Sequence, residues 1–406
     1  MNDLTRAPDA AVVKSASVAV WLVAAHALLM TGAYLVFRST PAMVAGNELS
    51  VERSIFASVN AGTLTGFQQG ISVRSYLLPA QIAVFVLMLS GTFVALTVGT
   101  LAVARILNLP YSTARVLGSA AVAQIIATAL GMAVVIGAER PPLEAAFQAA
   151  SAFGNCGLYL GTMPGVSTLQ TQLLLMLAIA GGLGLPVLME LFDSVTGWRK
   201  PSAHTRVCVA VTCGLFVVSF VVLLGFQWPK NIASVGSWHG SVASALTASL
   251  NCRTAGLPIE SVGTWPRAMQ WTVMVLMMIG TSPAGTGGGI KTTTLAQLFR
   301  GTRDALYGMH ARRVTGIAMV WIAAYLSIIV IATAWLLAML PEMPADRVLF
   351  MVVSAASNVG LSHDPLAMRG PALYVLSGTM LIGRFAPLIV LWWMAHTTTD
   401  ADLAIG

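Results

Sequence analysis

Charged residues are scarce in this sequence of 406 amino acids, which argues against a water-soluble fold. Only 9% of the residues are Asp, Glu, Lys or Arg, whereas 57% are hydrophobic and the mean hydropathy is +0.80. Soluble domains carry roughly 25% charged residues. No cluster of His, Asp or Glu stands within an apolar stretch. A polytopic membrane enzyme, which needs such groups for catalysis, is therefore disfavoured.

Cysteines are equally few. Cys156, Cys208, Cys213 and Cys252 are scattered along the chain without metal-ligand spacing. They predict neither a disulfide framework nor a metal site, and we expect them to pack as small residues. The chain also shows no nucleotide-hydrolysing domain and no aspartyl-phosphate motif, so the energy for any transport must come from ion gradients or from a partner.

Long apolar stretches, by contrast, are abundant. A helix needs roughly 20 apolar residues to cross a bilayer, and runs of about that length recur along the whole chain. They predict an all-α integral membrane protein with many spans, the first of which is retained rather than cleaved. The expected spans are 15–37, 77–103, 115–137, 173–191, 207–226, 269–280 continuing into the following loop, 317–340 and 374–393.

Basic residues are unevenly distributed between these spans. With a cytoplasmic N-terminus, the cytoplasmic segments carry the denser clusters, at 199–206 and 300–313. Positively charged loops stay on the cytoplasmic side. We therefore expect both termini in the cytoplasm and the protein in the cell inner (cytoplasmic) membrane. The net charge of +7 is then explained by membrane lipid, and no nucleic acid is expected as a partner.

Four short segments between paired spans share one pattern. Each is a helix-like stretch too short to cross a bilayer, as in re-entrant half-helices, and each leads into a turn that bears a glycine. The stretches are LSVERSIFASV, LEAAFQAASAF, GSVASALTASL and DRVLFMVVSAAS. The turns are NAGTLTGF (60–67), FGNCGLYL (153–160), NCRTAGLP (251–258) and ASNVGLSH (356–363).

The spacing of the turns predicts four tandem repeats. Taking Gly66, Gly157, Gly256 and Gly360 as equivalent gives intervals of 91, 99 and 104 residues, which indicates an internally repeated architecture. Each repeat is a span, a half-helix, a glycine turn and a second span. All four share one orientation, so they can surround a central pore with fourfold pseudosymmetry. The expected repeats are 1–104, 105–200, 201–314 with a glycine-rich loop at 280–292, and 315–406.

Glycine suits a turn whose carbonyls replace the water around an ion. A cation that enters a low-dielectric medium loses solvation worth on the order of tens of kcal/mol, and a ring of backbone carbonyls can restore it. Such a ring requires backbone angles that glycine adopts freely. The negative end of each half-helix also favours a cation. The turns carry no ring of carboxylates, so a dehydrated monovalent cation is expected.

The turns TLTGF, NCGL, RTAGL and NVGL, together with GTSPAGTGGGIKTTT (280–294) and LIGRFAPL (381–388), resemble the Trk/Ktr/HKT superfamily of potassium transporters. The likeness covers essentially the whole chain and is greatest for the Ktr-type membrane subunit, because a single span precedes the first turn. It implies K⁺ bound at a filter of backbone carbonyls. The implied filter residues are Thr63, Leu64, Thr65, Gly66, Asn155, Cys156, Gly157, Thr254, Ala255, Gly256, Asn358, Val359 and Gly360.

The glycine-rich loop also looks like a phosphate-cradling nucleotide loop, but that motif needs glycine directly before its lysine. Here Ile290 precedes Lys291. The resemblance implies instead that the loop lies across the pore as a gate beside an intramembrane arginine. A close helix–helix contact is the alternative for the loop, and a snorkelling or salt-bridged role is the alternative for the arginine. The implied gate residues are Gly285, Thr286, Gly287, Gly288, Gly289, Lys291 and Arg384.

Two further residues stand inside the turns. We expect the guanidinium of Arg253 to brace loop carbonyls. Cys156 replaces the residue that is usual in the family, and we expect this to change packing rather than ion ligation. In the plant branch of the superfamily, serine in the first turn goes with sodium selectivity, so Gly66 favours potassium by resemblance.

The resemblance also implies partners. It predicts a homodimer and a cytosolic nucleotide-binding regulatory ring, with the nucleotide held by that ring and no cofactor in this chain. K⁺ is the expected transported ion, and a sodium-coupled or sodium-permeable transporter of the same superfamily is the alternative. A pore subunit of a phosphorylating potassium pump is a further alternative, although such chains are longer and need a separate ATPase subunit.

Overall fold

The computed structural model describes residues 10–39, 49–136, 141–163, 165–166, 168–231, 238–310, 313–363 and 365–397. Over these residues the regular secondary structure is helical. The extended pairings among them are two isolated bridges, Gln69 with Leu366 and Ile279 with Ile290. The predicted all-α class is therefore confirmed.

A long helix followed by a short one recurs four times along the chain. The next helix is long in the first and fourth cases, whereas it has only 15 residues (α6) and 12 residues (α10) in the second and third. The four expected half-helices are present as helices of 12 or 13 residues. In chain order the helices are α1 (Ala10–Ser39), α2 (Val51–Gly62), α3 (Leu78–Ile106), α4 (Thr113–Ile136), α5 (Pro142–Phe153), α6 (Leu169–Leu183), α7 (Leu185–Val195), α8 (Ala203–Asn231), α9 (Trp238–Leu250), α10 (Arg267–Met278), α11 (Thr292–Leu306), α12 (Arg313–Met339), α13 (Ala345–Ala356) and α14 (Ala372–Thr397).

Three of the four short helices carry an acidic residue in their first turn. These residues are Glu52 in α2, Glu144 in α5 and Asp346 in α13. A carboxylate at this position stabilises the positive end of the helix dipole. The opposite, negative end of each short helix leads into its glycine turn.

Within the described residues, six helices are long and apolar enough to cross a membrane, namely α1, α3, α4, α8, α12 and α14. The protein is thus a multi-pass membrane protein. One predicted span is wrong as a continuous helix. Residues 173–191 are divided between α6 and α7, which meet at an angle of 99°. The break has two causes, a positive φ of 84° at Gly184 and Pro186, which lacks the N–H that would continue α6.

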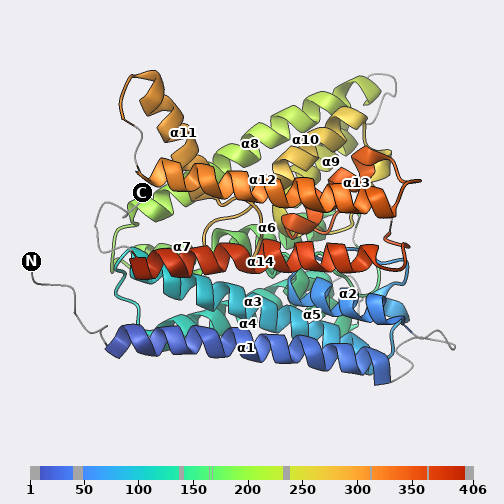
Figure 1. Cartoon of the computed structure of the whole chain (residues 1–406), viewed down its shortest axis with the longest axis horizontal. Helices are drawn as coiled ribbons and strands as arrows, with labels where there is room; N and C mark the ends of the chain where they lie inside the picture. The colour runs from blue at the N-terminus through green and yellow to red at the C-terminus, as the bar shows by residue number, and fades with distance from the viewer. Residues whose placement is uncertain are drawn as a thin grey trace, which may run out of the picture.

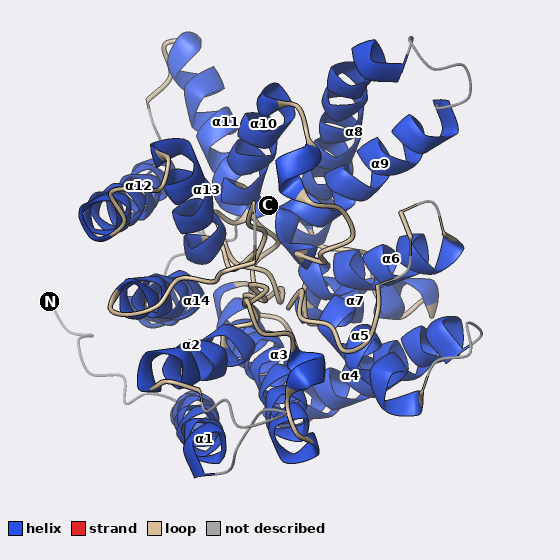
Figure 2. Ribbon diagram, turned by 90° about the vertical axis from the view of Figure 1, so that its right-hand side faces the viewer, coloured by secondary structure: helices blue, strands red, loops and turns tan. Residues whose placement is uncertain are grey.

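The long helices stand side by side around a centre occupied by loops. In Figure 1, α1, α12 and α14 run along the longest axis, and α1 begins at the end of the fold where α14 finishes. In the perpendicular view of Figure 2, the helices surround loop segments gathered in the middle. This arrangement brings turns that are distant in sequence to one place.

Candidate functional site

The four glycine turns meet at the centre of the fold. Each turn glycine lies so close to the backbone of another turn that a β-carbon built on it would overlap a carbonyl oxygen there. The contacts run in cyclic order around the four turns and close on the first. The pairs are Gly66 with Cys156, Gly157 with Gly256, Gly256 with Val359 and Gly360 with Thr65. We call these four glycines and the carbonyls that flank them the glycine ring.

Backbone angles explain why glycine is needed at these positions. All four ring glycines have positive φ, namely 85° at Gly66, 77° at Gly157, 60° at Gly256 and 83° at Gly360. A side chain there would be strained even without the neighbouring turn. Three turns also place a second left-handed residue two positions before the glycine, these being Leu64, Asn155 and Asn358.

The third turn differs from the other three. It is one residue shorter, since five positions separate Asn251 from Gly256 whereas six separate Asn60 from Gly66. Residues Asn251–Ala255 form a π-helical turn, in which the Gly256 N–H reaches back to the Asn251 carbonyl (3.4 Å). The side chain of Thr254 lies outside the described residues. The ring is therefore not chemically fourfold.

Asparagine side chains hold two of the four turns. The amide of Asn60 donates to the carbonyl (3.0 Å) and accepts from the N–H (2.9 Å) of the residue after Gly66. Asn251 makes the same pair of bonds to the residue after Gly256, at 2.7 and 2.8 Å. The second and fourth turns have serine at this position, and neither buried hydroxyl has a hydrogen-bond partner among the described residues. These serines are Ser151 and Ser354.

Other polar side chains of the first and fourth turns are hydrogen-bonded to neighbouring groups. The hydroxyl of Thr63 donates to the Val59 carbonyl and also contacts the Thr65 hydroxyl, both at 2.7 Å. Asn358 donates to Thr65 Oγ1 (2.9 Å) and to a carbonyl of α14 (3.0 Å). The side chain of Cys156 is fully buried in an apolar cluster. The turns thus present backbone carbonyls to one another.

The glycine-rich loop folds against this ring and is tied at its base. The Gly280 N–H donates to the Ile290 carbonyl (2.9 Å), and the Ile290 N–H donates to the Met278 carbonyl (2.8 Å). A β-carbon on Gly288 would overlap the carbonyl of Ser357, in the fourth turn. One predicted gate glycine, Gly288, is therefore in direct contact with the fourth turn.

The break between α6 and α7 provides a socket for the loop. Because residue 186 is proline, the carbonyl of Gly182 has no helical donor, and it accepts from the Ser282 N–H (3.1 Å) instead. The carbonyl of Gly181 accepts from the Thr286 N–H (3.1 Å). A β-carbon on Gly184 would come within 2.8 Å of the Pro283 carbonyl oxygen. Loop and broken helix are thus complementary at the level of the backbone.

Thr286 joins the loop to the second turn through its side chain. Its hydroxyl accepts from the Asn155 amide (2.7 Å) and donates to the Phe153 carbonyl (3.2 Å). Asn155 also donates to the Ala178 carbonyl (2.8 Å) in α6. One side chain of the turn therefore contacts both the loop and the helix that holds it.

Arg384, in α14, links the first turn to the loop. Its Nε donates to the Thr63 carbonyl (2.7 Å), and its Nη1 donates to the Thr286 carbonyl (2.5 Å). The side chain is buried, and it forms no salt bridge with any carboxylate of the described residues. Lys291 donates to the Gly287 carbonyl (2.7 Å). Both predicted cationic gate residues therefore bind carbonyls of the loop.

Arg253 braces the start of the loop, which confirms the role expected for its guanidinium. Nη2 donates to the Gly280 carbonyl (2.8 Å), and Nη1 donates to the Thr212 carbonyl in α8 (3.3 Å). The third turn is thereby tied to the point where α10 gives way to the loop.

Cavities lie on both sides of the ring and loop. On the ring side, a cavity of about 400 Å³ is lined by Gln68, Gly256, Glu260, Gly360 and His363 among others; we call it the vestibule. On the loop side, a mainly apolar cavity of about 120 Å³ is lined by Pro283 and Lys291 together with residues of α3, α11, α12 and α14. One open space therefore borders the ring, and the other borders the loop.

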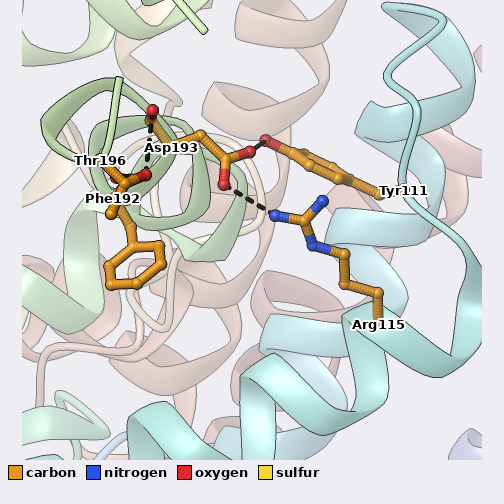
Figure 3. A network of polar contacts seen from close by, with 5 residues as sticks. All are labelled: Tyr111, Arg115, Phe192, Asp193 and Thr196. Atoms are coloured by element: carbon orange, nitrogen blue, oxygen red, sulfur yellow. Dashed lines mark hydrogen bonds and ion pairs between the residues drawn. The ribbon is translucent and has the colours of Figure 1, made fainter. Parts of the chain in front are cut away.

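The end of α7 remote from the loop is anchored by the polar network in Figure 3. Asp193 accepts from Arg115 (2.7 Å) and from the Tyr111 hydroxyl (3.1 Å). Its backbone carbonyl also accepts from Thr196 (3.2 Å). Burial, together with the hydrogen bond to the Asp193 carboxylate, raises the pKa of Tyr111 above its usual value. The network fixes α7 to the start of α4, through Arg115, and to the connection between α3 and α4, through Tyr111.

Comparison with known proteins identifies the chain. A family model described as TrkH, cation transport protein, matches residues 103–394. The chain belongs to this family. The chain is also similar to Ktr system potassium uptake proteins, so the resemblance to the Trk/Ktr superfamily is confirmed. The match includes the glycine-rich loop and three of the four turns, whereas the first turn, at 60–67, precedes it.

Individual relatives agree with this assignment. The Ktr system potassium uptake protein B of Vibrio alginolyticus is 30% identical over 275 residues, which cover 62% of this chain and 59% of that protein. The potassium/sodium uptake protein NtpJ of Enterococcus hirae is 27% identical over 275 residues, 63% of this chain and 60% of that protein. The chain thus spans about three-fifths of the length of these relatives.

A solved structure shares the fold. The crystal structure of the potassium transporter TrkH from Vibrio parahaemolyticus superposes with a TM-score of 0.68 at 20% sequence identity, covering 87% of this chain and 79% of that one. At this identity the similarity concerns the fold. The relatives are transporters rather than enzymes, which agrees with the absence of catalytic clusters expected from the sequence.

Several residues of the site escaped the sequence reasoning. Asn60 and Asn251, whose side chains each clamp a turn with two hydrogen bonds, could have been found by aligning the four turns. The two asparagines stand at nearly the same distance before the turn glycine. The socket was also visible in principle, in the sequence GGLGLP that ends α6 and begins α7. Gln68 contacts two ring carbonyls. The other turns have no glutamine at this position, so no repeated sequence pattern pointed to it.

Proposed function

We propose that this chain takes up potassium ions through a central pore whose narrowest part is the glycine ring. The observation that carries the proposal is the cyclic contact between the four turns. Carbonyls that converge from four directions can replace the hydration shell of a cation. The turns present no carboxylate, which favours a monovalent ion. The relatives named as potassium uptake proteins support the choice of K⁺.

We further propose that the glycine-rich loop closes the path below the ring. The loop lies between the ring and the apolar cavity, and it is held by backbone bonds to the α6–α7 break and by Arg384. Most of these bonds use backbone groups, so the closed position requires a defined loop conformation. Release of the loop would join the two cavities.

We place the protein in the inner membrane with both termini in the cytoplasm, as a homodimer controlled by a cytosolic nucleotide-binding ring. The basic clusters at 199–206 and 300–313 support the orientation. The relatives named as parts of a Ktr system support a multi-component assembly. Permeation by sodium is the second candidate, because one relative is named for potassium and sodium uptake.

The test is ion flux into liposomes that contain the purified protein. Uptake of radioactive rubidium should be saturable and should be inhibited by K⁺ at far lower concentration than by Na⁺. Equal inhibition by the two ions would favour the sodium-permeable alternative. Rubidium uptake no faster than in protein-free liposomes would contradict the proposed function.

A matched pair of variants tests whether ion flux depends on the glycine ring. Gly360→Ala places a methyl group against the Thr65 carbonyl, whereas Gly378 in α14 has no atom within 4 Å of the added carbon. We expect Gly360→Ala to abolish selective uptake and Gly378→Ala to retain it. Selective uptake by a folded Gly360→Ala protein would show that the ring does not carry the ion.

A further inference from the structure

Gln68 stands two residues after the first ring glycine and contacts two quarters of the ring at once. Its amide nitrogen lies 3.0 Å from the carbonyl oxygen of Gly66 and 3.0 Å from that of Gly157. A glutamine amide carries two N–H donors, so each carbonyl receives one. The side chain therefore bridges the first and second turns.

The backbone of this segment is held by the fourth repeat. The carbonyl of Gln68 accepts from the Leu366 N–H (2.8 Å), and the Gly70 N–H donates to the Leu366 carbonyl (3.1 Å). Arg53 donates to the same Leu366 carbonyl (3.2 Å). Because the main chain is fixed on both sides, the amide of Gln68 is positioned over the ring.

No other turn has an amide at this position. The residues two places after the remaining ring glycines are Tyr159, Pro258 and Ser362. None of them carries a group with two donors on one atom. Gln68 also lines the vestibule, together with Gly256 and Gly360. The side of the ring that faces the vestibule is thus hydrogen-bonded by one amide at two of its four glycines.

We propose that Gln68 is a positioning residue that weakens ion binding at the vestibule end of the ring and fixes the spacing of the first two turns. This inference rests on the proposed function. The amide hydrogens carry partial positive charge, so they compete with a cation for the same carbonyl oxygens. Weaker binding at this end favours transit, because conduction requires sites that release the ion.

The test replaces the amide by an apolar side chain of similar length, Gln68→Met. Removing two neutral hydrogen bonds should lower the KM for rubidium uptake by about 30-fold, with an unchanged or lower maximal rate. Stabilisation of the purified protein by K⁺ should reach half its maximum at a correspondingly lower concentration, since a tighter ligand stabilises at lower concentration. This second measurement does not depend on transport.

Gln69→Met is the matched control. Gln69 lines the same vestibule, and its side chain makes no hydrogen bond to a ring carbonyl. Its KM should stay at the wild-type value. Gln68→Glu is the second variant. It removes the donors and adds a negative charge beside the ring, so its KM should fall at least as far.

The outcomes separate this inference from the proposed function. Saturable wild-type uptake with an unchanged or higher KM in Gln68→Met would overturn the role of Gln68 and leave the pore intact. A loss of thermal stability and maximal rate without a fall in KM would show that Gln68 is only a structural brace, and would also overturn it. Absence of wild-type uptake, together with absence of K⁺ stabilisation, would overturn both proposals.

Discussion

Replacing Thr286 by valine should release the glycine-rich loop without disturbing its backbone. The substitution keeps the shape of the side chain but removes the bonds to Asn155 (2.7 Å) and Phe153 (3.2 Å). Each neutral hydrogen bond contributes about 0.5–1.5 kcal/mol net. Asn155 keeps its bond to Ala178, so its amide is not left without a partner. The docked loop should lose about 2 kcal/mol, the sum of two average bonds.

A change of this size shifts the ratio of released to docked loop by about 30-fold, since 1.4 kcal/mol corresponds to a factor of ten. If the docked loop closes the path, Thr286→Val should conduct rubidium several times faster than wild type in liposomes. Ion preference should be unchanged, because the ring is not touched. Thr286→Ser keeps the hydroxyl and should behave as wild type. A folded valine variant that conducts no faster would refute the docked loop as a closed gate.

Three further substitutions test other parts of the account. Tyr111→Phe should lower thermal stability at neutral pH, because it removes the bond to Asp193. Because the pKa of Tyr111 is raised in the folded state, wild type should lose stability as the pH rises above about 10, where the unfolded chain ionises first. This loss should be smaller in the variant, which has no phenol at this position. Tyr76→Phe should be neutral or stabilising by about 1 kcal/mol, because its buried hydroxyl has no partner in the described part of the chain, and burial raises the pKa of Tyr76 to about 12. Asn251→Ser should lower the melting temperature and reduce the preference for K⁺ over Na⁺ in flux assays, because the third turn loses both hydrogen bonds from Asn251 to Leu257. An unchanged preference would show that these two bonds do not shape the ring.

The convergence of the turns was predictable because its cause is local and repeated. A short helix followed by a glycine recurs four times, and the positive φ at Gly66 and its three equivalents is a conformation that glycine adopts readily. Arg253 was also predictable, since a guanidinium inside a turn has few partners other than carbonyls. Its bond to Gly280 confirms that reasoning.

What the sequence does not reveal is which distant backbone groups pair. Residues 173–191 are apolar except for Glu190 near the end, and they were expected to form one span. The bend at Gly184 is stabilised by the loop about a hundred residues later, through Ser282 and Thr286. The glycine-rich loop and its socket each have the sequence of an ordinary glycine-rich segment, and neither sequence indicates that the two segments pair. The bridge made by Gln68 was unpredictable for the same reason, because one of its acceptors lies 89 residues away.

The most direct measurement is an anomalous-scattering map from crystals of the protein grown with rubidium or thallium. The account predicts a peak within the glycine ring, surrounded by carbonyl oxygens from all four turns. A strong peak elsewhere in the membrane region, with none inside the ring, would contradict the claim that these four turns together bind the transported ion.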